Sequence, residues 1–465
     1  MRMGSTHFMY NYKTALNRAY QKQAKLFEQS DGSSLHRASD NPINYYKLMR
    51  YNISDTENEQ YRENIKTATS WMHNSDSVMV HMTEIMQTMK EKSTAAANSD
   101  KAEDDYAAIH KEMMACMQEM VSVANTQVGD RYLFSGQKDL TKPFVMSTNT
   151  YERGLAKNLD TAQATFFKGS DADYNTELFQ MLELETKDNA GNVTGTYYLD
   201  TGSGKIFTKD FVDKGYKDLV AQGYTSIDDV SSSYNVNSLA VYKKDDSGTE
   251  NDFRISNVFT NQGLLKKAAD VPSTATTTFT YKDGKVSGFT TNGTTYNFKT
   301  IQQNIVTYSG DENLISMVKL NGATDPTSDT VNSTGGRMFG RDIFDNADSG
   351  NEVSGTAMLN NLFTVCAKVE GCDTAWMSSD GVTVADVSHA TLVVEETRVG
   401  ARQQLYSSVE TMLEVQGDNI TEDITNVSGT DIAELATKLM QMTTLYNLSL
   451  SMGGRILPPS LADYL

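Results

Sequence analysis

Regular spacing of apolar side chains at both ends of the chain limits the possible folds more than any other feature. Within residues 9–26, these side chains recur at alternating intervals of three and four, with one polar break at Gln23. The same rhythm returns over residues 65–89, 106–123 and 432–446. Such a repeat lines one face of an α-helix, as in coiled coils. We call the two terminal runs the terminal seams, and their principal positions are Tyr12, Leu16 and Leu26, and Ile432, Leu435, Leu439, Met442 and Tyr446.

Further helices are expected between the terminal seams. The runs at 65–89 and 106–123 are separated by turn-forming residues at 98–101, which predicts two antiparallel helices. Residues 357–369 and 382–420 are also expected to be helical, and Thr430 or Asp431 is expected to cap the final helix. Apolar side chains on related faces of the 382–420 segment are Leu405, Val409, Met412 and Val415. Gly453-Gly454 and Pro458-Pro459 are expected to interrupt the last helix.

Methionine dominates the run at 65–89. The seam positions there include Met72, Met79, Met82, Met86 and Met89. Methionine is soft and adaptable, so a partner surface and a copper site are both conceivable. A third interpretation is an ordinary helical core, and this is the one we favour.

The chain changes character from about residue 131 to 341, where glycine, threonine, asparagine and aspartate become frequent. Short β-prone pieces lie at 196–199, 240–242, 278–281, 295–298 and 304–308. Asp283-Gly284, Asn292-Gly293 and Asn321-Gly322 are dipeptides typical of hairpin turns. These features predict a mainly antiparallel β region, with one helical patch near 210–221.

Helical ends around a β-rich middle predict a mainly α rod, in which N- and C-terminal helices pair as an antiparallel, coiled-coil-like bundle, with an inserted antiparallel β domain. An apolar stripe has to be buried against something, and pairing the two ends is the simplest solution. The expected divisions are a terminal coiled-coil core (1–40 with 425–465), a helical rod (41–150 with 341–424) and an inserted β-rich domain (151–340).

Charge and cysteine content exclude several classes of protein. The balance of 41 Lys+Arg against 60 Asp+Glu gives a net charge of −19, which argues against coating nucleic acid or an anionic membrane. Three cysteines exclude a disulfide framework, because Cys116 is far in sequence from Cys366 and Cys372 and the odd count leaves at least one thiol free. No apolar run approaches the ~20 residues of a membrane span. The N-terminus lacks the apolar core of a secretory signal, which favours the cytoplasm unless export proceeds without a cleaved signal.

Catalytic and metal-binding motifs are not recognisable. His73 and His81 are eight residues apart, which is no i,i+4 metal pair. Asp342, Asp345 and Asp348 miss the spacing of a calcium loop. Nucleotide-binding and hydrolase fingerprints are absent as well. We therefore expect no catalytic residue, no cofactor and no metal, and hence no enzyme.

Four motifs follow one another along the chain: the segment ending in Ser39-Asp40-Asn41-Pro42, the Gly129–Gly136 stretch with Pro143-Phe144, the Gly400-Ala401 turn of helix, and the C-terminal Ser460–Leu465. Together they resemble the flagellin-like axial proteins, in particular the hook-associated proteins of the hook–filament junction. The matching positions are Ser39, Asp40, Pro42, Arg131, Tyr132, Phe134, Gly136, Pro143, Phe144, Gly400, Ala401, Ser460, Leu461, Asp463, Tyr464 and Leu465. The similarity covers about residues 1–150 and 335–465.

The Ser39–Pro42 segment also has a local interpretation. Pro42 suits the first position of a helix, and Ser39, Asp40 or Asn41 can supply the capping oxygen. The segment is then either an ordinary capped loop or an elbow between the terminal helix and the next one, and the two descriptions are compatible.

The resemblance implies a structural subunit of the bacterial flagellum, a self-assembling adaptor at the hook–filament junction. The implied partners are identical subunits in a ring, the neighbouring hook-associated protein, hook and filament subunits, and the flagellar export chaperone and export apparatus. The implied location is extracellular, reached without a cleaved signal peptide and without membrane insertion. Two alternatives remain open: a flagellin of the filament, and an adhesin or glycan-binding role of the inserted β domain.

Overall fold

A computed structural model describes residues 5–98, 100–169, 178–201, 204–230, 237–238, 243–244, 250–251, 277–282, 285–317, 330–344 and 355–456. The chain divides into two compact units, which we describe separately. Unit 1 comprises Met1–Lys66 with Ser408–Leu465, and unit 2 comprises Thr67–Ser407. Unit 1 therefore combines the two ends of the chain, unit 2 is the uninterrupted middle, and the boundaries fall within α2 and α9.

The segments that carry the three-four apolar repeat are helical, as predicted. Their bounds are α1 Ser5–Glu28, α2 Pro42–Ala96, α3 Glu103–Ala124, α4 Thr161–Lys168, α5 Tyr216–Ala221, α6 Gly335–Phe339, α7 Ala357–Glu370, α8 Thr374–Trp376, α9 Val382–Ser428 and α10 Ile432–Ile456, with shorter 3-10 or π turns at Gln29–Asp31, Phe211–Gly215, Ile227–Asp229 and Met377–Gly381. Asp431 caps α10, because its carboxylate accepts hydrogen bonds from the backbone N–H groups of Ala433 (2.8 Å) and Glu434 (3.0 Å).

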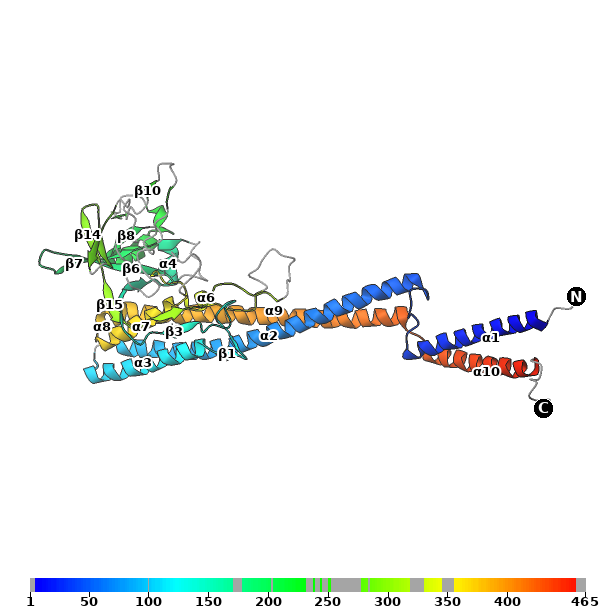
Figure 1. Ribbon diagram of the computed structural model, residues 1–465. Coiled ribbons are helices and arrows are strands. Elements are labelled where there is room, and N and C mark those ends of the chain that lie inside the picture. The colour runs from blue at the N-terminus through cyan, green and yellow to red at the C-terminus, as the bar shows by residue number, and fades with distance from the viewer. Residues whose placement is uncertain are drawn as a thin grey trace. The chain divides into compact units, whose positions relative to one another are not determined.

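Unit 1 holds two antiparallel helix pairs. In the first pair, α1 lies beside α10, and the loops at their near ends are joined by a β-bridge between Ser33 and Gly429 (Figure 1). In the second pair, the start of α2 lies beside the end of α9. There the side-chain amide of Asn58 donates to the carbonyl oxygen of Leu413 (3.1 Å), and Arg62 pairs with Glu414 (3.5 Å).

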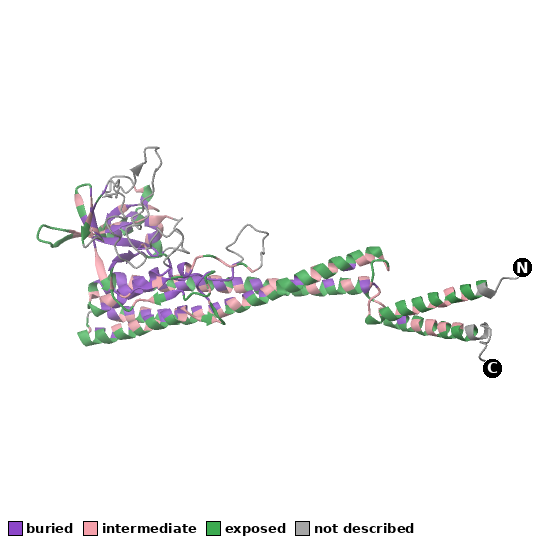
Figure 2. Ribbon diagram, in the orientation of Figure 1, coloured by how far each residue is buried: buried purple, intermediate pink, exposed green. Residues whose placement is uncertain are grey.

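The methionine-rich part of α2 belongs to the core of unit 2. Met72, Met79, Met82, Met86 and Met89 are at most 1% exposed, so the core interpretation is confirmed. Helix α3 lies antiparallel to this stretch of α2, and His81 Nε2 on α2 is 3.2 Å from Glu119 on α3. Helix α9 contacts the same stretch, where Glu396 accepts a hydrogen bond from the Thr83 hydroxyl (2.8 Å). Helix α7 is central to the unit, since each residue from 357 to 366 is buried (Figure 2).

The inserted domain is antiparallel, as predicted. Its main sheet has the order β12-β13-β14-β6-β7-β8-β9, with β5 pairing to β6, and two-stranded ribbons pair β4 with β15 and β3 with β16. The strand bounds are β1 Gln127–Val128, β2 Arg131–Tyr132, β3 Phe144–Met146, β4 Tyr151–Gly154, β5 Ala156–Asn158, β6 Gln180–Lys187, β7 Val193–Leu199, β8 Lys205–Thr208, β9 Asn237–Ser238, β10 Lys243–Lys244, β11 Glu250–Asn251, β12 Thr278–Lys282, β13 Lys285–Thr291, β14 Thr294–Phe298, β15 Thr300–Gln303 and β16 Val306–Tyr308.

Both faces of the main sheet carry apolar clusters. One cluster contains Leu182, Leu184, Phe289, Tyr296 and Phe298, and the other joins Met181, Tyr198 and Phe207 to α4 and α5. The predicted hairpin turn Asn292-Gly293 connects β13 to β14, and both residues have positive φ (50° and 77°). The predicted helical patch near 210–221 is present as the π turn Phe211–Gly215 and α5.

Three expectations from the sequence need correction. On α3, Met117 and Ala124 are buried where Cys116 and Val123 were expected, and the latter two are half-exposed. The reason is that α3 packs on α7 and also contacts α2, as in the His81–Glu119 pair. The related faces of α9 named above point outward: Leu405, Met412 and Val415 are exposed and Val409 is half-buried, while the buried apolar positions recur every seven residues at Leu392, Val399, Tyr406, Leu413 and Ile420.

The other two corrections concern element ends. The predicted strand at 304–308 begins only at Val306, because the Asn304 side chain donates to the Ser147 carbonyl between two ribbons (3.1 Å). Helix α10 continues through Gly453-Gly454 to Ile456. Residues 240–242, Asp283-Gly284, Asn321-Gly322, Pro458-Pro459 and Ser460–Leu465 lie outside the described residues. The division into three domains stays a prediction.

Candidate assembly site

The terminal seams face each other within unit 1. Hydrogen bonds run from the Tyr12 hydroxyl to the Ser449 carbonyl (2.7 Å) and from the Gln23 amide to the Thr443 hydroxyl (3.2 Å). Of the predicted seam residues, Leu435 is buried, and Tyr12, Leu16, Leu26, Leu439, Met442 and Tyr446 are half-buried. Ile432, the first residue of α10, is 58% exposed. A single pair of helices therefore covers this seam only in part.

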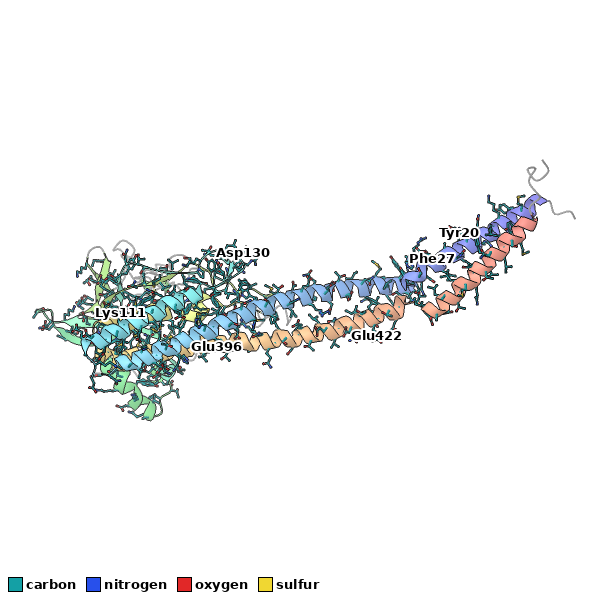
Figure 3. All side chains as sticks on the ribbon, turned by 90° about the horizontal axis from the view of Figure 1, so that it is seen from below. Tyr20, Phe27, Lys111, Asp130, Glu396 and Glu422 are labelled. Carbon is teal, nitrogen blue, oxygen red and sulfur yellow. The ribbon has the colours of Figure 1, made fainter. Side chains whose placement is uncertain are left out.

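A second apolar stripe on α10 has no cover among the described residues. Leu445, Leu448 and Met452 are each 55–59% exposed, and we call these three residues the outer stripe. At about 100° per residue they lie roughly a third of a turn from the seam that faces α1. On α1, Tyr20 and Phe27 are also exposed, at 59% and 68% (Figure 3). Sequence reasoning missed these residues, although the i, i+3, i+7 spacing of Leu445, Leu448 and Met452 was readable.

The Ser39–Pro42 segment forms an elbow between α1 and α2 that is held by hydrogen bonds and one ion pair. Pro42 is the first residue of α2, and Asn41 caps the helix by accepting from the backbone N–H of Asn44 (3.2 Å). Asp40 accepts from the Lys25 ammonium (2.7 Å) and from the backbone N–H groups of His36 and Arg37. The Lys25 bond, followed by the Arg37 backbone bond, lowers the pKa of Asp40 to about 2. Asp40 therefore stays ionised in all but strongly acidic solution. Ser39 is exposed.

The Gly129–Gly136 motif builds a tight turn on the core of unit 2. Phe134 and Phe144 are fully buried, and Arg131 pairs with Asp139 (3.4 Å). Gly136 has a φ of +69°, and a β-carbon there would collide with Asp311. This position requires glycine for a local reason. Tyr132 lies in β2, and Pro143 precedes β3, where its carbonyl accepts from the Ser309 N–H (2.8 Å).

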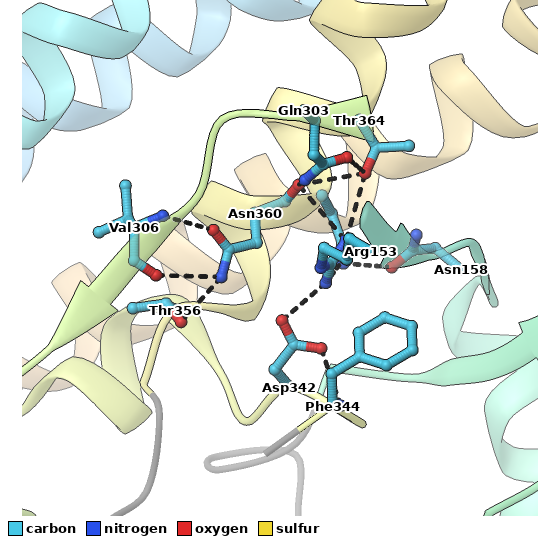
Figure 4. Close-up of polar contacts among 10 residues, drawn as sticks. Arg153, Asn158, Gln303, Val306, Asp342, Phe344, Thr356, Asn360 and Thr364 are labelled. Atoms are coloured by element: carbon cyan, nitrogen blue, oxygen red, sulfur yellow. Dashed lines mark hydrogen bonds and ion pairs between the residues drawn. The ribbon is translucent and has the colours of Figure 1, made fainter. Parts of the chain in front are cut away.

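A buried polar network joins the inserted domain to α7, and nothing in the sequence pattern indicated it. Arg153 on β4 is 1% exposed, and its guanidinium donates to Asp342 (2.6 Å), Asn361 (3.1 Å) and Thr364 (3.2 Å) (Figure 4). Around it, Asn360 binds both backbone groups of Val306, and Gln303 donates to the Asn360 carbonyl. Asp342, weighed above as a calcium ligand, is thus the counter-ion of Arg153.

A second buried cation lies one strand further on. Lys157 on β5 pairs with Asp380 (2.7 Å) and Asp213 (3.1 Å), and its ammonium lies 5.3 Å from the centre of the Tyr198 ring. Burial alone would lower the pKa of Lys157, yet the two carboxylates raise it. The Arg153–Asp342 and Lys157–Asp380 ion pairs therefore lie where the inserted domain meets α7 and the turn after it.

Three of the histidines contact other protein groups. His36 lies 2.8 Å from Asp31, His81 lies between Glu84 and Glu119, and His110 contacts the Cys366 carbonyl (2.9 Å). The three cysteines are free thiols, and burial raises the pKa of Cys366 to about 12. Across the part of the chain that the structure describes, no group of three metal-ligating side chains occurs, and no helix is long and apolar enough to cross a membrane.

The N-terminal helices resemble those of a known class of bacterial protein. Residues 7–139 match the bacterial flagellin N-terminal helical region. The resemblance to the flagellin-like axial proteins that the motifs indicated is therefore confirmed.

Curated relatives point to one branch of that class. Flagellar hook-associated protein 3 of Salmonella typhimurium is 28% identical over 165 residues, which cover 34% of this chain and 52% of the relative. The protein of the same name from Escherichia coli is 28% identical over 153 residues, covering 32% and 48%. This chain thus spans about half the length of the curated relatives it matches. Flagellar hook-associated protein 3 from Legionella pneumophila has a solved structure that aligns with 82% of this chain and 98% of its own, at 12% identity and a TM-score of 0.37.

Proposed function

We propose that this protein is a structural subunit of the bacterial flagellum, a self-assembling adaptor at the hook–filament junction. The observation that carries the proposal is the incomplete burial of the terminal helices. Unit 1 pairs α1 with α10 along one seam and leaves the outer stripe in water. Exposed apolar surface of this kind marks a protein interface. The flagellin N-terminal match and the names of the curated relatives support a flagellar partner for it.

The proposal includes the partners and location implied above. Identical subunits in a ring and adjoining hook-associated, hook and filament subunits would cover the terminal helices. The chain would leave the cell through the flagellar export apparatus with an export chaperone, and it would act outside the cell without catalysis. Cells that lack this protein should assemble hooks and release filament subunits into the medium. A chain present in thousands of copies along each filament would instead be a flagellin, and normal filaments in its absence would contradict the adaptor role.

Two substitutions separate folding of the terminal pair from its assembly. Leu448→Asp should leave the α1–α10 pair intact, because Leu448 is 55% exposed, while assembly fails. Burying one such side chain is worth about 1.5–3 kcal/mol, and the loss repeats in every subunit. Leu439→Asp should damage both properties, since the half-buried Leu439 belongs to the seam that faces α1. Circular dichroism of the monomer and release of filament subunits measure the two effects. His73→Ala serves as a control, and normal assembly of Leu448→Asp would refute a role for the outer stripe.

A further inference from the structure

The outward face of α9 in unit 2 has an unusual composition, and it contains the Gly400-Ala401 motif. Between residues 393 and 405, the residues on the side away from the core are Val393, Val394, Thr397, Gly400, Ala401, Gln404 and Leu405, and we call them the α9 face. Val394 and Leu405 are 54% and 41% exposed. The opposite side of the same stretch carries the buried residues Leu392, Val399 and Tyr406. Unlike an ordinary surface helix, α9 is thus largely apolar on two sides here.

Charge is missing from the α9 face although this stretch contains four charged residues. Glu395 is buried, accepts from the Ser333 hydroxyl (2.5 Å) and pairs with Arg398. Glu396 accepts from Thr83, and Arg402 donates to the Thr330 carbonyl (3.1 Å). All four therefore have partners within unit 2, and the hydroxyl of Thr397 is bound to the Val393 carbonyl (2.7 Å). The face that remains consists mainly of methyl groups and bare backbone, with one uncharged amide at position 404.

Gly400 adds a separate geometric observation. A β-carbon built at Gly400 meets no atom of the described residues within 4 Å, so packing against them does not require glycine there. Glycine also lowers the stability of a helix interior relative to alanine. A glycine on an outward helical face does permit the backbone of another helix to approach closely.

We propose that the α9 face docks a helix of a second copy of this chain, with the closest approach at Gly400. The inference rests on the proposed function and names the surface that subunits use. A second copy is the occupant that the charge favours: each chain carries a net charge of −19, so copies repel one another unless they meet across an uncharged surface. The α9 face is such a surface, and removing its exposed valines and leucine from water contributes favourable free energy to the contact.

Site-specific photo-crosslinking in assembled flagella tests the identity of the occupant. A benzophenone amino acid at Leu405 should produce a crosslinked dimer of this chain. The same probe at Ala108, exposed on α3 among Asp104, Asp105, Lys111 and Glu112, should not. If the chain is present in purified hook–filament preparations but Leu405 crosslinks to a different flagellar protein or to nothing, the inference is overturned. Absence of the chain from those preparations would overturn the proposed function as well.

Gly400→Leu tests the close approach. Because the space around Gly400 is open, the monomer should unfold at an unchanged or higher urea concentration. The yield of the Leu405 crosslink should fall about tenfold or more, as for the loss of a well-packed contact. Ala108→Leu is the matched control and should change neither quantity. An undiminished crosslink in Gly400→Leu would overturn the proposed contact at Gly400.

Discussion

Replacing residues 156–298 with an Asn-Gly turn should leave the helices of unit 2 folded, whereas deleting residues 151–340 should prevent their folding. The ends of the 156–298 deletion lie next to each other, at the paired strands β4 and β15. Gly154 on β4 pairs with Thr300 on β15, and the Leu155 N–H donates to the Lys299 carbonyl (2.6 Å). The two cut ends are therefore adjacent and antiparallel, and a two-residue Asn-Gly turn suits such ends.

The larger deletion fails for a physical reason. It removes Arg153, Gln303 and Val306, whose side chains and backbone satisfy polar groups of α7. It also removes Ser333, which donates to the buried Glu395. Helix α7 would then present to water a face whose residues from 357 to 366 are all buried in the intact protein.

Tryptophan fluorescence measures this difference directly. Both tryptophans, Trp71 and Trp376, belong to unit 2, so urea unfolding followed by fluorescence reports on this unit. The shorter deletion should unfold cooperatively, and it should carry Asp380→Asn because Lys157 is lost. The larger deletion should be insoluble or lack a transition. Cooperative unfolding of the larger deletion would show that the inserted domain does not support α7.

Local patterns predicted the helices well, because a three-four repeat is a property of neighbouring residues. On a helix with two apolar faces, the repeat does not indicate which face points toward the core. On α9 the apolar residues Leu405 and Met412 are exposed, while Val399, Tyr406 and Leu413 lie in the core. Which face packs inward depends on neighbouring elements, which periodicity does not describe.

The polar network around Arg153 was beyond sequence reasoning for a different reason. Arg153 and Asp342 are 189 residues apart in the chain, and Arg153 and Asn361 are 208 apart. A lone arginine in a β-prone segment resembles any solvated strand residue, because its burial is decided by α7 and not by its neighbours in sequence. The elbow was predictable, since Asn41 and Asp40 act on groups within a few residues of themselves, apart from the bond to Lys25.

Arg153→Met should destabilise unit 2 by about 3–5 kcal/mol, the usual cost of leaving one partner of a buried ion pair uncompensated. Asp342 would lose its guanidinium partner at a site where its side chain is only 2% exposed. Asn361 would lose a hydrogen bond to its side-chain oxygen as well. The measurement is urea unfolding followed by tryptophan fluorescence, with the slope of the free energy against urea unchanged if only stability is affected.

The double variant Arg153→Met/Asp342→Leu shows whether the charge itself is the cause. With both ions gone, no charge of this pair is left buried without a partner, so most of the lost stability should return. Methionine can still pack on the Phe344 ring, whose centre lies 4.6 Å from the guanidinium carbon of Arg153 in the native protein. Lys187→Met breaks the partly exposed pair with Glu185 in the same domain and should cost no more than about 1 kcal/mol. If the double variant is as unstable as Arg153→Met alone, the loss comes from packing and hydrogen bonds. The ion pair would then not be what holds the inserted domain on α7.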